Sequence, residues 1–260
     1  MTQAAISEIA LTLVQARKNH QPADASRFTD QLQSTADAYA VQQAVFKTLQ
    51  GTNAASARTW KTGGPNRSSE QTHAALLPDG ILKNGADMRD WPLNIRIVEI
   101  EIALRINQDV TPATAATISH AASQELIDAM TVSIEIVDSR WQQAGAAQAL
   151  LKLADMQSHG TLVLGDWVAY TQADHQRDWT KQHCSVKIGD QPVASFVGTH
   201  TLQDPTYVLP AWLKYVTASG MTVPAGTVVT TGSWCGMPFA KKGDLIVAEF
   251  DGIGKTSVQL

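Results

Sequence analysis

Two carboxylates stand two positions apart inside an otherwise apolar run, Ile97-Val98-Glu99-Ile100-Glu101-Ile102-Ala103-Leu104. Apolar residues at every second position predict a β-strand with one face toward a core, because residues i and i+2 of a strand share a face. Glu99 and Glu101 would then lie together on the opposite face, about 6 to 7 Å apart. Like charges at that distance repel, so a proton, a Lys or Arg side chain, or a divalent cation must neutralise them. The fold must therefore provide a partner for this face of the strand.

Two simpler explanations place the glutamates in water or pair them across the sheet. Polar residues on one face contact water in many antiparallel sheets, and Arg96 or Arg105 could also serve as ion-pair partners. A second segment, 132–140, weighs against both explanations, because its even-numbered positions are apolar up to residue 136 while Glu135 lies opposite. Three carboxylates on non-core faces would form the all-oxygen ligand set that Mg²⁺ or Mn²⁺ prefers.

Asp138 and Arg140 close the second segment. The parity of Asp138 is opposite to that of Glu135, so its side chain is expected on the core side, where a salt bridge or hydrogen bond with Arg140 is the plainer role. Parity favours Glu135 as the third ligand, but a β-bulge would reverse the two faces. Asp138 is therefore kept as the alternative ligand.

Composition describes an ordinary globular chain of 260 residues, with 44% hydrophobic and 17% charged residues. A net charge of −4 gives no basic footprint, so nucleic acid is not the expected partner. The two cysteines, Cys184 and Cys235, lie far apart and indicate free thiols in a reducing compartment. Neither an apolar leader nor a long apolar run is present in the sequence, so we expect a cytoplasmic protein without a membrane partner.

The spacing of hydrophobic residues predicts two parts, a helical N-terminal lobe over 1–57 and a β-rich domain over 58–260. Amphipathic spacing predicts helices over about 4–20 and from Ser34 to Gly51. Further helices are predicted near 119–130, 146–156 and 207–219, and strands over 95–106, 131–138, 161–168, 184–189, 192–199, 226–231 and 244–250. Because strands outnumber helices and do not alternate with them, the expected class is α+β with a mixed or antiparallel sheet.

Lys61 and Asp79 are further candidates, each in a segment rich in turn residues. Lys61 precedes Gly63-Gly64-Pro65, and its ammonium could be a solvated loop charge or could lie beside a substrate carboxylate or enolate. Asp79 sits in Pro78-Asp79-Gly80, a strong turn signal that carries little weight alone. The histidines form no zinc-binding pair in the sequence, and His183-Cys184 cannot readily pair as base and thiol because strand neighbours point to opposite faces.

An ordered set of segments resembles the fumarylacetoacetate hydrolase superfamily, in the branch of 2-keto-4-pentenoate hydratases and 4-oxalocrotonate decarboxylases. The set comprises Asp37-Ala38-Tyr39-Ala40-Val41-Gln42, Trp60-Lys61-Thr62-Gly63, Leu76-Leu77-Pro78-Asp79, Val98-Glu99-Ile100-Glu101-Ile102-Ala103, Ile134-Glu135-Ile136-Val137-Asp138-Ser139-Arg140, Leu162-Val163-Leu164-Gly165, Pro210-Ala211-Trp212-Leu213, Val229-Thr230-Thr231-Gly232-Ser233 and Gly243-Asp244 through Gly252-Ile253-Gly254. Each segment alone is a weak signal, but their shared order over most of the chain is a strong one.

The resemblance implies a fold and a set of roles. The fold would be a mixed β-roll with a helical N-terminal part, usually in a homo-oligomer. Glu99, Glu101 and Glu135 match the Mg²⁺ or Mn²⁺ ligands, while Lys61 and Asp79 match positions implicated in proton transfer and substrate orientation. Three further positions, Gly63, Thr231 and Ser233, are expected to line the substrate pocket.

The function that follows from the resemblance is a metal-dependent hydratase acting on 2-hydroxy-2,4-dienoate or 2-oxo-4-enoate substrates in the breakdown of aromatic compounds. A 4-oxalocrotonate-type decarboxylase and an acylpyruvate C–C hydrolase are the alternatives within the superfamily. The His/Glu pair with which the hydrolases activate water has no support in the sequence. A third hypothesis is a non-catalytic subunit in a complex with a neighbouring pathway enzyme.

Overall fold

Two β-sheets form the body of the protein in the computed structural model, which describes residues 2–52 and 54–260. The larger sheet contains β1 (Thr59–Gly63), β2 (Thr72–Ala75), β3 (Ile81–Lys83), β5 (Ile97–Ile106), β6 (Ile127–Val137), β7 (His159–Leu164), β8 (Val168–Ala169) and β11 (Val228–Thr230). Its order is β2-β1-β11-β5-β6-β7-β3, and β8 also pairs with β6. The smaller sheet contains β4 (Ala86–Asp87), β9 (His183–Ile188), β10 (Ala194–Val197), β12 (Leu245–Phe250) and β13 (Gly254–Gln259), in the order β10-β9-β12-β13-β4. Parallel and antiparallel pairs occur in both sheets, which confirms the predicted mixed α+β class.

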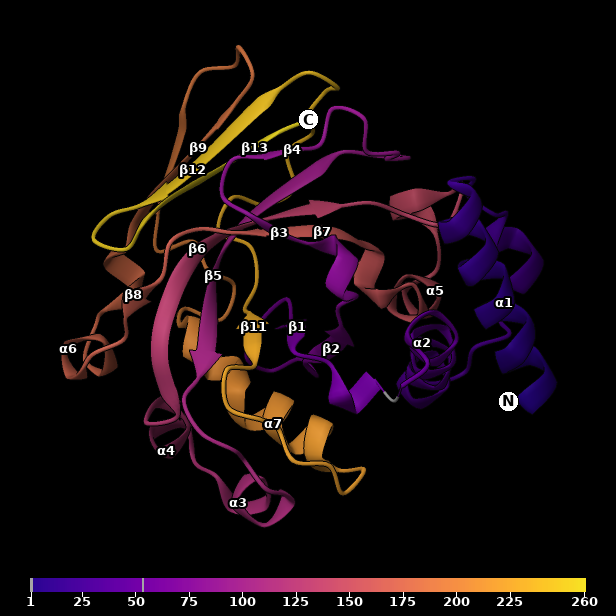
Figure 1. The fold of residues 1–260 in the computed structure, drawn as a ribbon, viewed down its shortest axis with the longest axis horizontal. Coiled ribbons are helices and arrows are strands. Elements are labelled where there is room, and N and C mark those ends of the chain that lie inside the picture. Colours follow the sequence, from indigo (N-terminus) through magenta and orange to yellow (C-terminus); the bar gives the residue numbers. More distant parts are fainter. Residues whose placement is uncertain (1, 53) are drawn as a thin grey trace.

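Helices flank the larger sheet on two sides (Figure 1). They are α1 (Gln3–Asn19), α2 (Thr35–Gln50), α3 (Pro112–Thr117), α4 (His120–Gln124), α5 (Ala149–Ala154), α6 (Gln172–His175) and α7 (Leu209–Thr217). Helix α2 begins and ends where its sequence indicates. The Ser34 side chain caps its first turn by accepting a hydrogen bond from the Asp37 amide, and Gly51 ends it with a φ of 70°, a left-handed conformation that glycine adopts without strain.

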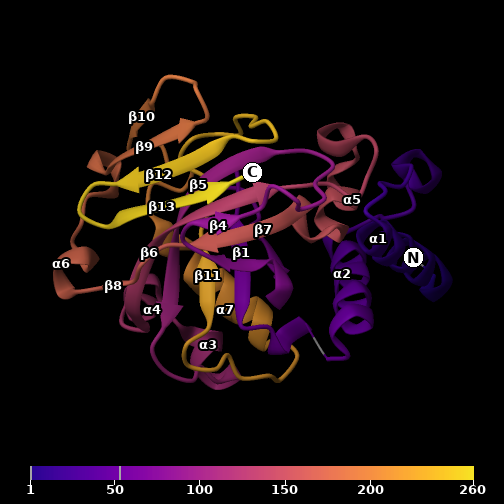
Figure 2. The ribbon, with the colours of Figure 1, turned by 45° about the horizontal axis from the view of Figure 1, so that its top comes forward.

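Strands β5 and β6 form the centre of the larger sheet, and both of their faces are covered. Antiparallel pairing sets Glu99 directly opposite Glu135 and Ile100 opposite Ile134. The apolar face, which contains Ile100 and Ile134, is fully buried, and β12 and β13 of the smaller sheet pack across β6 (Figure 2). The predicted parity of both segments is therefore confirmed. The other face, which carries the glutamates, faces the inside of the curled sheet.

The curl of the larger sheet brings Lys61 to the same interior. Lys61 of β1 pairs with Thr230 of β11, and Thr230 pairs with Ala103 of β5. Strand β1 therefore lies three strands from β6, about 14 Å away in a flat sheet. Nevertheless, Nζ of Lys61 lies 2.6 Å from a Glu135 oxygen. Curvature and two long side chains close this distance, so the concave face of the sheet becomes a site.

Several expectations from the sequence differ from the structure, and the short strands β2, β3 and β4 are among the elements that were not expected. The helix expected over 119–130 ends at Gln124, and the following residues begin β6 at Ile127, because Ile127, Ala129 and Met130 pair with β5 or β8 and are buried. Strand β13 lies in a segment for which no strand was expected. Its residues alternate with weak hydrophobicity, and its pairing with β12 and β4 fixes it as a strand.

The helical lobe expected over 1–57 includes residues 1 and 53, which lie outside the described residues. In the remainder, α1 packs on α2, and α2 packs on α5 of the β-rich part. One hydrophobic cluster contains Ile9 and Val41 of these helices together with Leu151 of α5. Among the described residues, no helix is both long and apolar enough to cross a membrane.

Candidate metal centre

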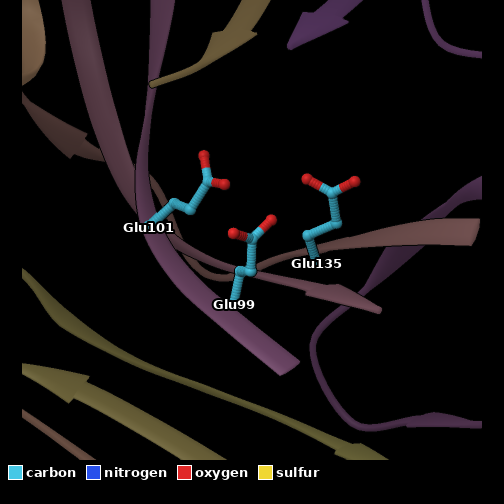
Figure 3. Close-up of side chains that lie close together, drawn as sticks. All are labelled: Glu99, Glu101 and Glu135. Carbon is cyan, nitrogen blue, oxygen red and sulfur yellow. The ribbon is translucent and has the colours of Figure 1, made fainter. Parts of the chain in front are cut away.

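Three glutamates, which we call the glutamate triad, meet on the concave face of the larger sheet. Glu99 and Glu135 are register partners on neighbouring strands, and Glu101 follows two residues after Glu99 on the same face. One carboxylate oxygen from each residue lies within 4.8 Å of the corresponding oxygens of the other two. Figure 3 shows the three carboxylates converging from β5 and β6. The structure thus brings together the three ligands predicted from sequence.

Burial makes this cluster costly without added positive charge. Glu135 is fully buried and Glu101 is 2% exposed, which excludes the solvated strand face. Burial raises the pKa of Glu99 to about 8, and the two neighbouring carboxylates add to the rise. Burial and Glu135 also raise the pKa of Glu101. For Glu135, burial acts upward, but Lys61 and His159 outweigh it and bring the pKa to about 2. In the absence of a cation, protons therefore remain on the triad at neutral pH.

Lys61 is the single cation in contact with the triad among the described residues. Its Nζ lies 2.6 Å from Oε1 of Glu135 and 4.0 Å from Oε2 of Glu99. Burial disfavours its charged form, but the carboxylates outweigh burial and raise its pKa, with Glu135 contributing most. Lys61 is therefore a protonated ammonium at neutral pH. One positive charge faces three carboxylates, so the triad keeps a deficit that protons or a divalent cation must make up.

The hydrogen bonds of Glu135 and Glu101 leave one oxygen of each carboxylate available. Oε1 of Glu135 contacts both Lys61 and His159, whereas its Oε2 is buried with no hydrogen-bond partner. Oε2 of Glu101 accepts hydrogen bonds from the Thr230 hydroxyl and from the Gly232 amide, 2.8 Å away. A buried carboxylate oxygen without a partner is expensive, and a hard divalent cation is the partner that oxygen ligands suit. The residues present therefore fit Mg²⁺ or Mn²⁺.

A cavity of about 610 Å³ opens beside the triad. Its charged lining residues, within the described part of the chain, are Lys61, Glu99, Glu101 and Lys152. Its apolar lining residues are Ile95, Ile97, Val137, Ala149, Leu150, Leu153 and Met237. A small organic acid with a carbon chain suits such a cavity, because its acidic end can reach the charged groups while its chain contacts the apolar wall.

Asp79 does not lie in this cavity. The 3₁₀ turn Pro78–Gly80 directs it into a second cavity of about 450 Å³, which is also lined by Asp138, Arg140 and Gly160. Leu77, which precedes the turn, is buried in the core, and the turn contacts β7. The expectation that Asp79 shares a site with Lys61 is therefore corrected.

Asp138 and Arg140 serve the structure and not the triad. Oδ1 of Asp138 accepts hydrogen bonds from the amides of Asn94 and Ile95, both at 2.9 Å. Its Oδ2 lies 3.6 Å from Arg140, whose guanidinium donates to Asp155 at 2.6 Å. Asp138 is thus oriented away from the glutamates, and the parity argument for Glu135 as third ligand is supported over the alternative.

The three positions expected in the substrate pocket separate into two groups. Gly63 and Ser233 line the 610 Å³ cavity. Thr231 does not, because its hydroxyl turns back to donate to the Ile102 carbonyl at 2.7 Å. Its neighbour Thr230 instead faces the triad. The alternation of β11 explains the difference, since Thr230 shares a face with Lys61, its register partner on β1.

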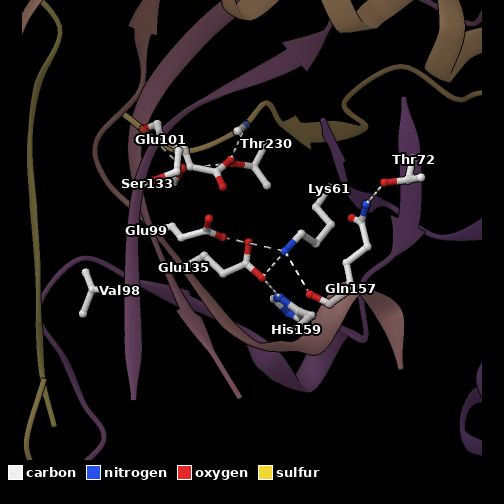
Figure 4. Close-up of polar contacts among 12 residues, drawn as sticks. Lys61, Thr72, Val98, Glu99, Glu101, Ser133, Glu135, Gln157, His159 and Thr230 are labelled. Atoms are coloured by element: carbon white, nitrogen blue, oxygen red, sulfur yellow. Dashed lines mark hydrogen bonds and ion pairs between the residues drawn. The ribbon is translucent and has the colours of Figure 1, made fainter. Parts of the chain in front are cut away.

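Two residues of the site, Gln157 and His159, were missed from the sequence. Three successive non-glycine residues, Met156, Gln157 and Ser158, have φ angles of 51°, 55° and 58° and form a left-handed turn. The turn places the Gln157 carbonyl 3.5 Å from Lys61 Nζ and its side-chain amide against Thr72 (Figure 4). Residues in such strained conformations cluster at functional sites. No local pattern in the sequence marks this turn, because it contains neither glycine nor proline.

A curled mixed sheet with helices on its flanks and three carboxylates converging on its concave face defines the class of this protein as an α+β fold with a candidate cation site. The chain belongs to the fumarylacetoacetate hydrolase family, because residues 87–260 match the family model described as the fumarylacetoacetate (FAA) hydrolase C-terminal domain. A comparison with curated protein sequences finds no match.

Solved structures share the fold over the whole chain or most of it. A 4-oxalocrotonate decarboxylase from Pseudomonas putida G7, complexed with magnesium and adipate, is 18% identical, with a TM-score of 0.82 over 100% of this chain and 98% of that one. The same enzyme complexed with calcium and acetate gives a TM-score of 0.81 at the same identity and coverage. A 2-hydroxyhepta-2,4-diene-1,7-dioate isomerase from Mycobacterium marinum is 16% identical, with a TM-score of 0.55 over 78% of this chain and 74% of that one.

Proposed function

We propose that this protein is a divalent-metal-dependent lyase that hydrates a 2-hydroxy-2,4-dienoate or its 2-oxo-4-enoate tautomer. The observation that carries the proposal is the glutamate triad, which presents available carboxylate oxygens beside a cavity of about 610 Å³. Glu99, Glu101 and Glu135 would hold Mg²⁺ or Mn²⁺. The two structures of a 4-oxalocrotonate decarboxylase reported above are complexed with magnesium or calcium, which supports this ligand class.

The reaction class follows from the charges at the site. When bound, a divalent cation supplies Lewis-acid stabilisation of the negative charge that develops on a 2-oxo group. Lys61, held protonated by the carboxylates, adds a fixed positive charge and an N–H donor at the cavity wall. Its raised pKa makes it a proton donor and not a general base. Enolate formation from a 2-oxo acid needs this arrangement of positive charge.

Hydrolytic C–C cleavage receives less support. That reaction needs a base that activates water, and no histidine is among the described residues that line the cavity. His159, which contacts Glu135, is 1% exposed and lies behind the triad. Hydration also adds a water, and we prefer it to hydrolysis because the resemblance of the sequence, in both the Lys61 segment and the triad, is to the branch of hydratases and decarboxylases.

Decarboxylation of a 4-oxalocrotonate-type substrate is the second candidate. The fold similarity to a 4-oxalocrotonate decarboxylase extends over the whole chain, including the N-terminal helices, and that enzyme was solved with adipate, a dicarboxylate. Loss of CO₂ requires the same stabilised enolate but no activated water. Product analysis separates the candidates, because hydration keeps every carbon in one molecule, hydrolysis gives two organic acids and decarboxylation releases CO₂.

The test is a panel of 2-hydroxydienoates, 4-oxalocrotonate and acylpyruvates incubated with the protein and Mg²⁺ or Mn²⁺, followed by ultraviolet absorbance and mass spectrometry. We expect turnover of a 2-hydroxydienoate to a product heavier by one water. Cation binding without turnover of any substrate would support the non-catalytic subunit instead. Full activity in excess EDTA would contradict the proposed metal dependence.

Replacing Glu99 or Glu101 by Gln tests the ligand assignment. Each change keeps the shape of the side chain but removes a negative charge, so we expect loss of metal-dependent turnover by more than a hundredfold with the fold retained. Circular dichroism checks the fold, and calorimetric titration with Mn²⁺ checks the affinity. Asp79→Asn is the matched control, because Asp79 lines the other cavity and its loss should leave Mn²⁺ affinity unchanged.

A further inference from the structure

His159 is a buried histidine that lies directly behind one member of the glutamate triad. Its Nδ1 lies 3.0 Å from Oε1 of Glu135, and the two side chains are 1% and 0% exposed. We propose that His159 is a positioning residue, which a β-bulge at Gly160 brings to the face of Glu135. Its hydrogen bond to Oε1 would hold the Glu135 carboxylate so that Oε2 is presented to a divalent cation. The inference rests on the metal dependence in the proposed function and assigns a role that the triad alone does not imply.

The bulge lies between β6 and β7. Glu135 pairs with Leu162 and Ile136 with Thr161, but Val137 pairs with His159, so Gly160 has no partner of its own on β6. A regular strand would place His159 on the same face as Thr161, opposite to Glu135. One extra residue in a strand moves the side chains beyond the bulge to the opposite faces of the sheet. His159 thus shares a face with Val137, and therefore with Glu135.

Only glycine fits at the extra position. A Cβ at Gly160 would lie 2.4 Å from the Ile136 carbonyl oxygen and 2.9 Å from Cβ of Asp138. Neither neighbour can move easily, because the first is backbone in the central strand and Asp138 is held by two amides and Arg140. Gly160 therefore allows the close approach of β7 to β6 that brings the imidazole to the carboxylate.

The contact defines which atoms carry protons. A carboxylate only accepts hydrogen bonds, so Nδ1 of His159 is the donor, and Nε2 is left buried with no hydrogen-bond partner. Lys61 donates to the same Oε1 at 2.6 Å. Two donors on Oε1 fix the carboxylate rotamer and leave Oε2 of Glu135 unpartnered toward the triad (Figure 4). Such partners of ligand side chains typically change metal affinity 10- to 100-fold when removed.

A purely space-filling role for His159 predicts a different result. In that case a side chain of similar volume should preserve cation affinity whether or not it can donate a hydrogen bond. In the positioning role, the donor at the Nδ1 position is what matters, since the Glu135 rotamer depends on it.

The test compares three variants of the full chain by Mn²⁺ titration, using electron paramagnetic resonance of free Mn²⁺ and calorimetry. His159→Phe keeps the ring but removes the donor, and we expect its affinity for Mn²⁺ to fall 10- to 100-fold. His159→Asn places an amide N–H at the Nδ1 position and should restore affinity to within about threefold of wild type. His159→Gln carries its amide one bond farther out and should remain weak.

His73→Phe is the matched control, because His73 is similarly buried but contacts the Thr62 hydroxyl and no carboxylate. It should retain wild-type Mn²⁺ affinity. Equal Mn²⁺ affinity in His159→Phe and wild type would overturn the inference. Equal Mn²⁺ affinity in His159→Asn and His159→Gln would also overturn it, and this second comparison remains decisive if His159→Phe fails to fold. If the wild-type protein binds no Mn²⁺, the proposed metal centre fails together with the inference; if only the variant pattern fails, the metal centre stands.

Discussion

Two carboxylates of the triad, Glu101 and Glu135, use one oxygen for contacts within the protein and leave the other oxygen available. Glu135 gives Oε1 to Lys61 and His159, and Glu101 gives Oε2 to Thr230 and Gly232. This arrangement orients the remaining oxygens before any ligand arrives, which lowers the reorganisation that binding requires. Glu99, which has only Lys61 at 4.0 Å, is the least constrained of the three.

Sequence reasoning reached the triad because it depends on strand parity alone. Glu99, Glu101 and Glu135 each face away from an apolar side, and their convergence required only that β5 and β6 be neighbours. Asp79 entered the predicted site only through the family resemblance, and the structure places it at the other cavity, because a turn signal alone does not determine where a side chain points. His159 could not be predicted, since its face depends on a one-residue bulge that no local pattern marks.

Replacing Lys61 by Met separates the role of this residue from that of the ligands. We expect turnover to fall at least a hundredfold, because the cavity loses its protonated ammonium. The metal-free protein should lose about 3 to 5 kcal/mol of unfolding free energy, since Glu135 then keeps a buried charge without its ion pair. Affinity for Mn²⁺ should stay within a few-fold of wild type, because the loss of a repelling positive charge offsets the loss of one of the two donors that orient Glu135. Urea unfolding, steady-state kinetics and Mn²⁺ titration provide the measurements.

Lys214→Met, on the exposed side of α7, is the control for loss of a lysine and should leave all three properties unchanged. The assignment of Lys61 would fail if Lys61→Met kept wild-type turnover. It would also fail if Mn²⁺ affinity fell as far as in Glu99→Gln, because Lys61 would then act through the cation site.

At the scale of elements, one buried histidine joins β2 to its surroundings. Nδ1 of His73 contacts the Thr62 hydroxyl of β1 at 2.7 Å, its backbone amide donates to the Tyr39 hydroxyl of α2, and its ring packs on Tyr215 of α7 at 4.8 Å. Burial lowers the pKa of His73 to about 3. The contacts around β2 therefore require a neutral imidazole.

Stability should consequently fall with acidification in a defined window. As the pH drops below about 6.5, His73 binds a proton in the unfolded chain, whereas in the folded protein it stays neutral down to about pH 3. In this window, His73 lowers the unfolding free energy by at most about 1.4 kcal/mol for each pH unit of acidification. In His73→Gln, which is less stable at pH 7.5, the decrease between pH 6.5 and 5 should be shallower by that amount. Urea unfolding at pH 7.5, 6.5, 5.5 and 5 measures it.

Tyr39→Phe is the matched control, because it removes a hydroxyl from the same contact but keeps the imidazole. Its pH slope should equal that of the wild type. A wild-type slope in His73→Gln would show that His73 does not carry this pH dependence.

Local sequence pattern was sufficient to predict some helices and strands but not others. Caps such as Ser34 and Gly51 predicted α2 to within a residue, since the capping groups are local. The segment after Gln124 has the composition of a helix, yet Ile127 to Val137 forms β6, because burial against both neighbouring strands outweighs helix propensity.

For the whole molecule, the N-terminal helices and the β-roll share one hydrophobic cluster. Helix α2 supports α5 through a hydrogen bond from Gln42 to the Leu153 carbonyl at 2.6 Å, and Leu153 lines the cavity beside the triad. Helix α2 also contributes Thr35 to the lining of that cavity, so the N-terminal part of the chain both supports its wall and forms part of it. The boundary near residue 57 marks a change of secondary structure within a continuous core.

Unfolding should therefore occur in one transition. We expect tryptophan fluorescence and far-ultraviolet circular dichroism to give the same urea midpoint, because residues such as Trp141 and Trp212 are buried in the cluster that both parts share. Residues 58–260 expressed alone should fail to unfold cooperatively and should not bind Mn²⁺. Two separate midpoints, or a folded and cation-binding fragment, would show that the parts are independent.

The balance of charge inside the curled sheet has a consequence for the life of the protein in a cell. Three acids and one ammonium share a largely buried space, so the form without a cation is the less stable one, and any ligand that supplies positive charge shifts the population toward the folded state. Proteases digest opened chains faster than closed ones. Starvation for the cation would thus lower the amount of the polypeptide as well as its activity, and the steady-state abundance of the protein would follow the supply of the metal.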